Sequence, residues 1–230
     1  MFVLLTLLSA SGIAYAQRID VAFNIGYATF NAAGLKTMQD VWLTQMPEDA
    51  AITNAFPGYL NYRVEAVFFD STYYVGIVLG HTSTGGRIQY ADYSGAATAD
   101  QLVVMNYTGF VAARRVASTS FGDIFLGGNV SIYRNKVDLK YSEVIYDTEY
   151  SSSSKYESFN LALGASAQVQ KRFGRLYVKG SAGYEAHIAM DLYFGDPDNK
   201  YIMSTGETVK VNADGLRIDI GVGYTVYTRK

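Results

Sequence analysis

The sequence predicts an all-β fold: an eight-stranded antiparallel up-and-down transmembrane β-barrel after an N-terminal signal peptide. Three observations lead to this prediction. The chain has 20 Tyr and 22 Gly but only 17% charged residues, against about 25% in an ordinary soluble domain. Apolar and polar side chains alternate along extended segments, and short and long connections follow each other in turn. Such a chain suits a protein whose exterior is largely hidden from water.

The charge and the cysteine count exclude several classes of function. The net charge of -2 gives no basic surface for a nucleic-acid partner. The absence of cysteine excludes disulfides, thiolate metal sites and a lipidated cysteine. We therefore expect no nucleic-acid binding. Neither of the two histidines has a metal-ligand spacing, so we also expect no metal, and we expect no cofactor.

The amino terminus has the features of an export signal. Phe2 to Leu8 is an apolar run, and Ala14-Tyr15-Ala16 supplies the small residues of a cleavage site. We expect residues 1–16 to be a signal peptide and residues 17–230 to form one barrel domain. No other apolar stretch is long enough for a membrane-spanning helix.

Eight segments alternate with a period of two, so each has one apolar and one polar face. In the first, Ile19, Val21 and Phe23 share a face opposite Asp20 and Ala22. The predicted strands are 19–28, 60–68, 73–80, 102–115, 124–132, 159–170, 176–188 and 216–226. The register of 102–115 stays unassigned, because Val103 and Val104 are adjacent.

The connections predict how the strands are arranged. They are short near 70–71, 117–120 and 171–174, and long over 31–58, 82–100, 135–157 and 194–213. All long loops then lie at one end and both termini at the other, which places the termini in the periplasm. We expect a short amphipathic helix within Leu35–Met46 and a solvated loop tip at Ser151–Ser154.

Alternation alone does not decide which face points outward. The polar face consists mainly of Gly, Ala, Ser and Asn, which suits the narrow lumen of an eight-stranded barrel. Tyrosines near the segment ends fit the aromatic girdles of membrane barrels: Tyr27, Tyr59, Tyr62, Tyr73, Tyr184, Tyr224 and Tyr227. The alternative is a soluble periplasmic lipocalin-like carrier with its apolar face inward.

The few ionisable residues of the polar face are the candidate site. Closure of the barrel is expected to bring Asp20 near Arg217 and Asp219. Charges in a narrow lumen need partners, so we predict one interior network of paired groups: Asp20, Arg63, Glu65, Lys179, Glu185, His187, Arg217 and Asp219.

These features resemble a known group. The signal peptide, the eight strands and the closing run Gly221 to Tyr227 are similar to the small outer-membrane β-barrel superfamily of OmpA-type and OmpX-type porin-like proteins. The stretch Gly86 to Gly95, followed by Asp100-Gln101, resembles a loop of such barrels. The resemblance implies a monomeric, non-enzymatic protein of the cell outer membrane, surrounded by lipid and lipopolysaccharide. We expect a role in envelope integrity, adhesion or loop-mediated binding of an extracellular ligand.

One motif supports an enzymatic alternative. His81-Thr82-Ser83 puts His81 and Ser83 on the same, lipid-facing side of a strand end. This arrangement resembles that of outer-membrane lipid A deacylases, in which a histidine activates a serine toward lipid esters. No acidic residue that orients the histidine is identifiable in the sequence.

Overall fold

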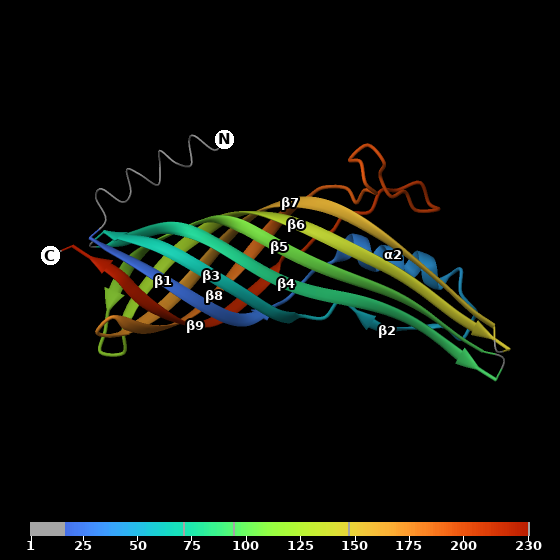
Figure 1. Ribbon diagram of the computed structural model, residues 1–230, viewed down its shortest axis with the longest axis horizontal. Coiled ribbons are helices and arrows are strands. Elements are labelled where there is room, and N and C mark those ends of the chain that lie inside the picture. The colour runs from blue at the N-terminus through green and yellow to red at the C-terminus, as the bar shows by residue number, and fades with distance from the viewer. Residues whose placement is uncertain (1–16, 71, 94, 147, 230) are drawn as a thin grey trace.

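A computed structural model describes residues 17–70, 72–93, 95–146 and 148–229. The expected signal peptide lies outside these residues. Eight strands close an antiparallel barrel and a ninth, short strand is added to its rim, so the predicted all-β barrel is confirmed (Figure 1). The elements are β1 (Arg18–Ala28), α2 (Ala33–Leu43), β2 (Ala51–Ala55), β3 (Tyr59–Asp70), β4 (Tyr73–Asp92), β5 (Gly95–Ser118), β6 (Asp123–Ile145), β7 (Thr148–Phe173), β8 (Leu176–Ala189) and β9 (Gly215–Thr228). No helix among the described segments is long and apolar enough to span a bilayer.

Pairing of the first and last strands closes the barrel. β1 and β9 are antiparallel, from Arg18 beside Thr228 to Ala28 beside Arg217, with an irregularity between Ile19 and Asp20. Every other barrel strand pairs with the strand before and after it in sequence, counting β1 and β3 as successive. The topology is therefore the predicted up-and-down meander, without crossovers.

The two ends of the barrel differ as predicted. β1 starts and β9 ends at one end, where β3–β4, β5–β6 and β7–β8 are joined by short turns. Figure 1 shows this end at the left, and the longer structures at the right. We call the right-hand end the distal end.

Two of the predicted long loops are wrong. β4 continues to Asp92 and β5 starts at Gly95; β6 continues to Ile145 and β7 starts at Thr148. The segments 82–100 and 135–157 are thus mostly strand, and β4–β7 extend beyond the barrel as a four-stranded sheet (Figure 1). The tract Ser151–Ser154, expected in a loop, pairs with β6. Hydrogen bonds to a neighbouring strand outweigh the weak strand preference of serine here.

Helix α2 and the segment 190–214 pack on the inner face of this extended sheet. The helix confirms the prediction for this region, and it buries Leu35 and Met38 completely or nearly so. Its first turn is tied to the segment by a hydrogen bond from the backbone N–H of Ala32 to the carbonyl of Asn212 (2.8 Å). We call helix α2 and the segment 190–214, together with the inner face of the sheet that they cover, the cap. Its core includes Leu35, Met38, Phe56, Val103, Val137, Leu139, Leu192, Met203, Val209 and Val211.

The structure also settles the register of the segment that the sequence left open. Val103 is fully buried in the cap core and Val104 faces outward. The two adjacent valines obscure the alternation because Val104 is an apolar side chain on the outer face, where its neighbours on the adjacent strands are Ser83 and Lys136.

Candidate functional site: a filled polar lumen

The structure places the predicted ionisable residues inside the barrel. The buried members are Asp20, Glu65, Lys179, Glu185, His187, Arg217 and Asp219, and Arg63 is partly buried. They form three layers along the barrel axis. An apolar ligand cavity, which the lipocalin-like alternative requires, is replaced by ion pairs, so the structure contradicts that alternative.

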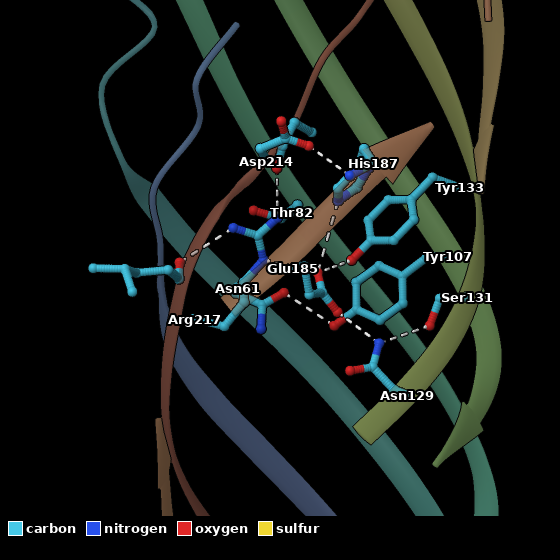
Figure 2. Close-up of polar contacts among 12 residues, drawn as sticks. Asn61, Thr82, Tyr107, Asn129, Ser131, Tyr133, Glu185, His187, Asp214 and Arg217 are labelled. Carbon is cyan, nitrogen blue, oxygen red and sulfur yellow. Dashed lines mark hydrogen bonds and ion pairs between the residues drawn. The ribbon is translucent and has the colours of Figure 1, made fainter. Parts of the chain in front are cut away.

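The layer nearest the cap is centred on Glu185 (Figure 2). One carboxylate oxygen accepts hydrogen bonds from Tyr133 Oη (2.7 Å) and Arg217 Nε (3.1 Å), and the other accepts one from Asn129 Nδ2 (2.8 Å). Arg217 also donates to the carbonyls of Thr29 (2.7 Å) and Ala213 (2.9 Å). Arg217 therefore joins the lumen to the base of the cap.

The middle layer contains two cations and two carboxylates. Arg63 lies between Glu65 (Nε–Oε1, 2.8 Å) and Asp219 (Nη2–Oδ2, 3.3 Å). Lys179 donates to the other oxygen of Glu65. Asn61 donates to Asp219 (2.9 Å) and accepts from Tyr107 Oη (3.1 Å), which links this layer to the tyrosines above it.

The layer nearest the termini contains Asp20, but not with the predicted neighbours. Asp20 pairs with Arg18 (3.1 Å) and with Arg172, and accepts a hydrogen bond from Thr225 (2.7 Å). The expectation that it would lie near Arg217 and Asp219 is wrong. Because β1 and β9 are antiparallel, the start of β1 meets the end of β9, so Asp20 lies opposite Thr225.

Sequence reasoning missed Arg172 and the inward tyrosines. Gln168 and Gln170 point inward at the end of the predicted strand 159–170, and Arg172 continues the same alternation two residues beyond it. With it, five cations (Arg18, Arg63, Arg172, Lys179 and Arg217) are paired with four carboxylates (Asp20, Glu65, Glu185 and Asp219) in the three layers. Tyr107, Tyr133 and Tyr177 are buried inside, whereas the seven tyrosines predicted for the girdles are all outward and exposed.

Inward glycines make room for these tyrosines. A Cβ at Gly80 would lie 2.0 Å from the ring of Tyr107, and one at Gly223 would lie 2.1 Å from the ring of Tyr177. Tyr107 in turn stacks on Tyr133 with ring centroids 4.5 Å apart. The cavity left between the layers is about 30 Å³, which is room for about one or two water molecules. Side chains therefore fill the lumen.

The histidine and serine of the enzymatic alternative are on the outer surface of the barrel. His81 is exposed and Ser83 is half-buried, both on the outward face of β4. Nδ1 of His81 is 2.9 Å from Oδ1 of Asn106, which lies opposite it on β5. The structure thus supplies an orienting group, an amide, that the sequence did not reveal.

The fold and the interior together define a class: a closed up-and-down β-barrel with an apolar exterior and a lumen filled by paired charges. No family model and no curated protein sequence matches the chain. Among solved structures, it is similar to Ail, the attachment invasion locus protein of Yersinia pestis, with a TM-score of 0.39 and 13% identity over 90% of this chain and 99% of that chain. It is also similar to the outer membrane protease OmpT of Escherichia coli, with a TM-score of 0.34 and 9% identity over 91% of this chain and 97% of that chain.

The pair Lys179–Glu65 tests whether the charges of the middle layer are energetically coupled. Each side chain is at most 4% exposed, and removing one partner of a buried pair costs about 3–5 kcal/mol. Lys179→Met and Glu65→Gln should each destabilise the barrel strongly, and the double variant should lose less than the sum by at least about 1 kcal/mol. Urea unfolding in lipid vesicles measures this.

Lys155→Met is the matched control, because Lys155 is exposed on the extended sheet. It should change the free energy of unfolding by no more than about 0.5 kcal/mol. Strictly additive losses at Lys179 and Glu65 would contradict a coupled interior.

Proposed function

We propose that the chain is an integral outer-membrane β-barrel protein, and the uncharged apolar belt around its exterior is the observation that supports this most. On β7, the outward positions between Glu157 and Lys171 carry no charge: Phe159, Leu161, Leu163, Ala165, Ala167 and Val169. The ten steps from Phe159 to Val169, at about 3.3 Å each and tilted by about 40°, give a belt about 25 Å tall. That is the height expected for the lipid-facing band of an outer-membrane barrel.

Tyrosines mark both borders of this belt. Tyr27, Tyr59 and Tyr62 lie toward the distal border, and Tyr73 and Tyr224 toward the border near the termini; all are between 38% and 53% exposed. Tyrosine favours the bilayer interface, because its ring is apolar and its hydroxyl is polar. The positions of these tyrosines therefore support the proposal that the apolar belt lies within the bilayer.

The difference between the two ends of the barrel supports one orientation of the protein in the membrane. Outer-membrane barrels have short periplasmic turns and longer structures outside the cell, so we assign both termini to the periplasm and the cap to the exterior. Beyond the belt, the outward face of the extended sheet becomes charged, with pairs such as Arg87–Asp100 and Arg134–Glu157. The arginines of these pairs, together with Lys136 and Lys140, suit contact with the phosphates of lipopolysaccharide.

A filled lumen argues against solute transport. The three charged layers and the cap lie in series along the only axis that a solute would follow. We propose a monomeric protein that does not act as a general porin and whose cap provides loop-mediated binding at the cell surface.

Membrane fractionation, followed by gel mobility with and without boiling, tests the proposal. The protein should be recovered with the outer membrane and should migrate faster unboiled, since a closed barrel resists detergent. The double variant Ile218→Lys/Ile220→Lys adds two charges to the belt of β9, each costing about 2–4 kcal/mol near the bilayer midplane, and should lower the folded fraction. Recovery of the wild type as a soluble periplasmic protein would contradict the proposal.

A second candidate function rests on the His81–Asn106 contact. An amide that accepts the Nδ1 proton of His81 would leave Nε2 free as a general base for Ser83. Both residues follow Leu79, the last large apolar side chain on the outward face of β4, at the border of the belt. In a lipid deacylase reaction, Ser83 Oγ would attack an ester carbonyl while Nε2 takes its proton and returns it to the leaving sugar oxygen. Water would then hydrolyse the acyl-serine.

Mass spectrometry of lipid A from cells that express the protein tests this candidate. Wild type should remove an ester-linked acyl chain, whereas Ser83→Ala and His81→Ala should not. Ser153→Ala, which changes a serine on the same side of the extended sheet, should retain the activity. Unaltered lipid A in cells with folded wild-type protein would eliminate this candidate.

A further inference from the structure

We propose that a cleft in the cap binds a neutral oligosaccharide. The cleft lies at the distal end, between the uncovered inner face of the extended sheet, the C-terminal end of α2 and the segment 190–214, and its volume is about 520 Å³. This is within the range of small-molecule binding sites. The inference deepens the proposed binding role, but the cleft itself exists whatever the cellular location of the protein.

The cleft forms because α2 covers only part of the sheet. Leu35 and Met38 bury the section nearest the barrel, and the chain then leaves the helix after Leu43. Tyr141 and Leu139 on β6 and Tyr156 on β7 line the section beyond it. Along each of these two strands every second side chain points toward the cleft, because side chains alternate between the two faces of a sheet.

Aromatic rings form the walls of the cleft and hold one another in place. Trp42 donates from Nε1 to Oη of Tyr201 (3.3 Å). Tyr201 packs edge-on against Tyr156, with ring centroids 5.1 Å apart and an interplanar angle of 84°. Tyr156 also contacts Phe194 at 5.8 Å. Fixed rings with accessible faces can pack against the C–H face of a sugar without losing conformational freedom on binding.

Short polar side chains lie beside the rings. Ser152 and Ser154 line the cleft from β7, and Gln45 lines it from the end of α2. Burial, with the carboxylate of Glu143 that its hydroxyl hydrogen-bonds, raises the pKa of Tyr141. Apolar faces combined with hydroxyl, amide and carboxylate groups match a ligand that presents C–H faces and many hydroxyls.

The charges favour a neutral sugar over an anionic one. Glu143 lines the cleft, and its negative charge would repel a sulfate, phosphate or uronate. Lys140 borders the cleft, but its ammonium group lies 3.8 Å from Asp138, the residue two positions back on the same face of β6. An anionic glycan would therefore meet a carboxylate without a dedicated cationic partner.

The tract Ser151–Ser154 provides a matched pair of variants. Ser152 and Ser154 line the cleft, whereas Ser151 and Ser153 alternate to the other face of the same strand. Trp42 is the only tryptophan of the chain, so its fluorescence reports on the cleft directly.

The test is titration of the purified, folded protein with maltohexaose, cellohexaose, chitohexaose and mannohexaose, followed by Trp42 fluorescence and by calorimetry. A detergent without a sugar headgroup is required, because maltoside would compete. At least one neutral probe should bind saturably. Tyr141→Ala should raise its Kd about tenfold or more, Ser152→Ala/Ser154→Ala should raise it several-fold, and Ser151→Ala/Ser153→Ala should leave it unchanged.

Three results would overturn the inference: no saturable binding of any neutral probe by either method, tighter binding of dextran sulfate or of an extended peptide, or unchanged binding in Tyr141→Ala. The heat-dependent gel shift shows separately whether each variant is a folded barrel. If Tyr141→Ala does not fold, Tyr141→Phe keeps the ring and removes the hydroxyl, and should raise Kd several-fold. Failure of sugar binding with an intact gel shift would reject the cleft proposal and leave the membrane-barrel proposal standing.

Discussion

The hydrogen-bonded ladder between β1 and β9 is the constraint on which the rest of the structure depends. It leaves the barrel without an edge, which is what a sheet needs where no water can satisfy its backbone. Closure also fixes the register, so every second side chain points into a narrow lumen. The polar side chains must therefore form hydrogen bonds and ion pairs with one another inside the lumen, and the apolar side chains must face outward.

The interior meets this demand by pairing charges in layers. Glu65, Glu185 and Asp219 each have at least two hydrogen-bond or ion-pair partners, and Arg217 also donates to the carbonyl of Thr29 at the base of the cap. Such pairs add little stability relative to an apolar core, but an unpaired member is costly. A lumen filled in this way is closed, so a site for the proposed ligand has to lie on the cap or on the outer surface.

The sequence was informative where one period held throughout a segment. Alternation predicted the eight barrel strands, the inward charges and the outward tyrosines. It did not reveal the extended sheet, because beyond Leu79 and Ile132 the outer face turns from apolar to charged and the inner face is covered by the cap. It also did not reveal which charges pair, since Asp20 and Arg172 are far apart in sequence and meet only through closure. The aromatic cleft depends on where α2 ends relative to the sheet, a tertiary relation without a local signal.

The most direct test of the central claim is a nitroxide scan of β4, which is practical because the chain has no cysteine. Single cysteines at positions 75, 77, 78, 79, 81 and 82, which leave the inward glycines in place, are labelled in lipid vesicles. They should show high oxygen accessibility at Val75, Ile77 and Leu79 and low accessibility to both oxygen and a water-soluble nickel reagent at Val78 and Thr82. The oxygen signal should fall at His81, where the belt ends. Accessibility with the opposite phase, or without a period of two, would contradict a barrel with its apolar face toward lipid and its lumen filled.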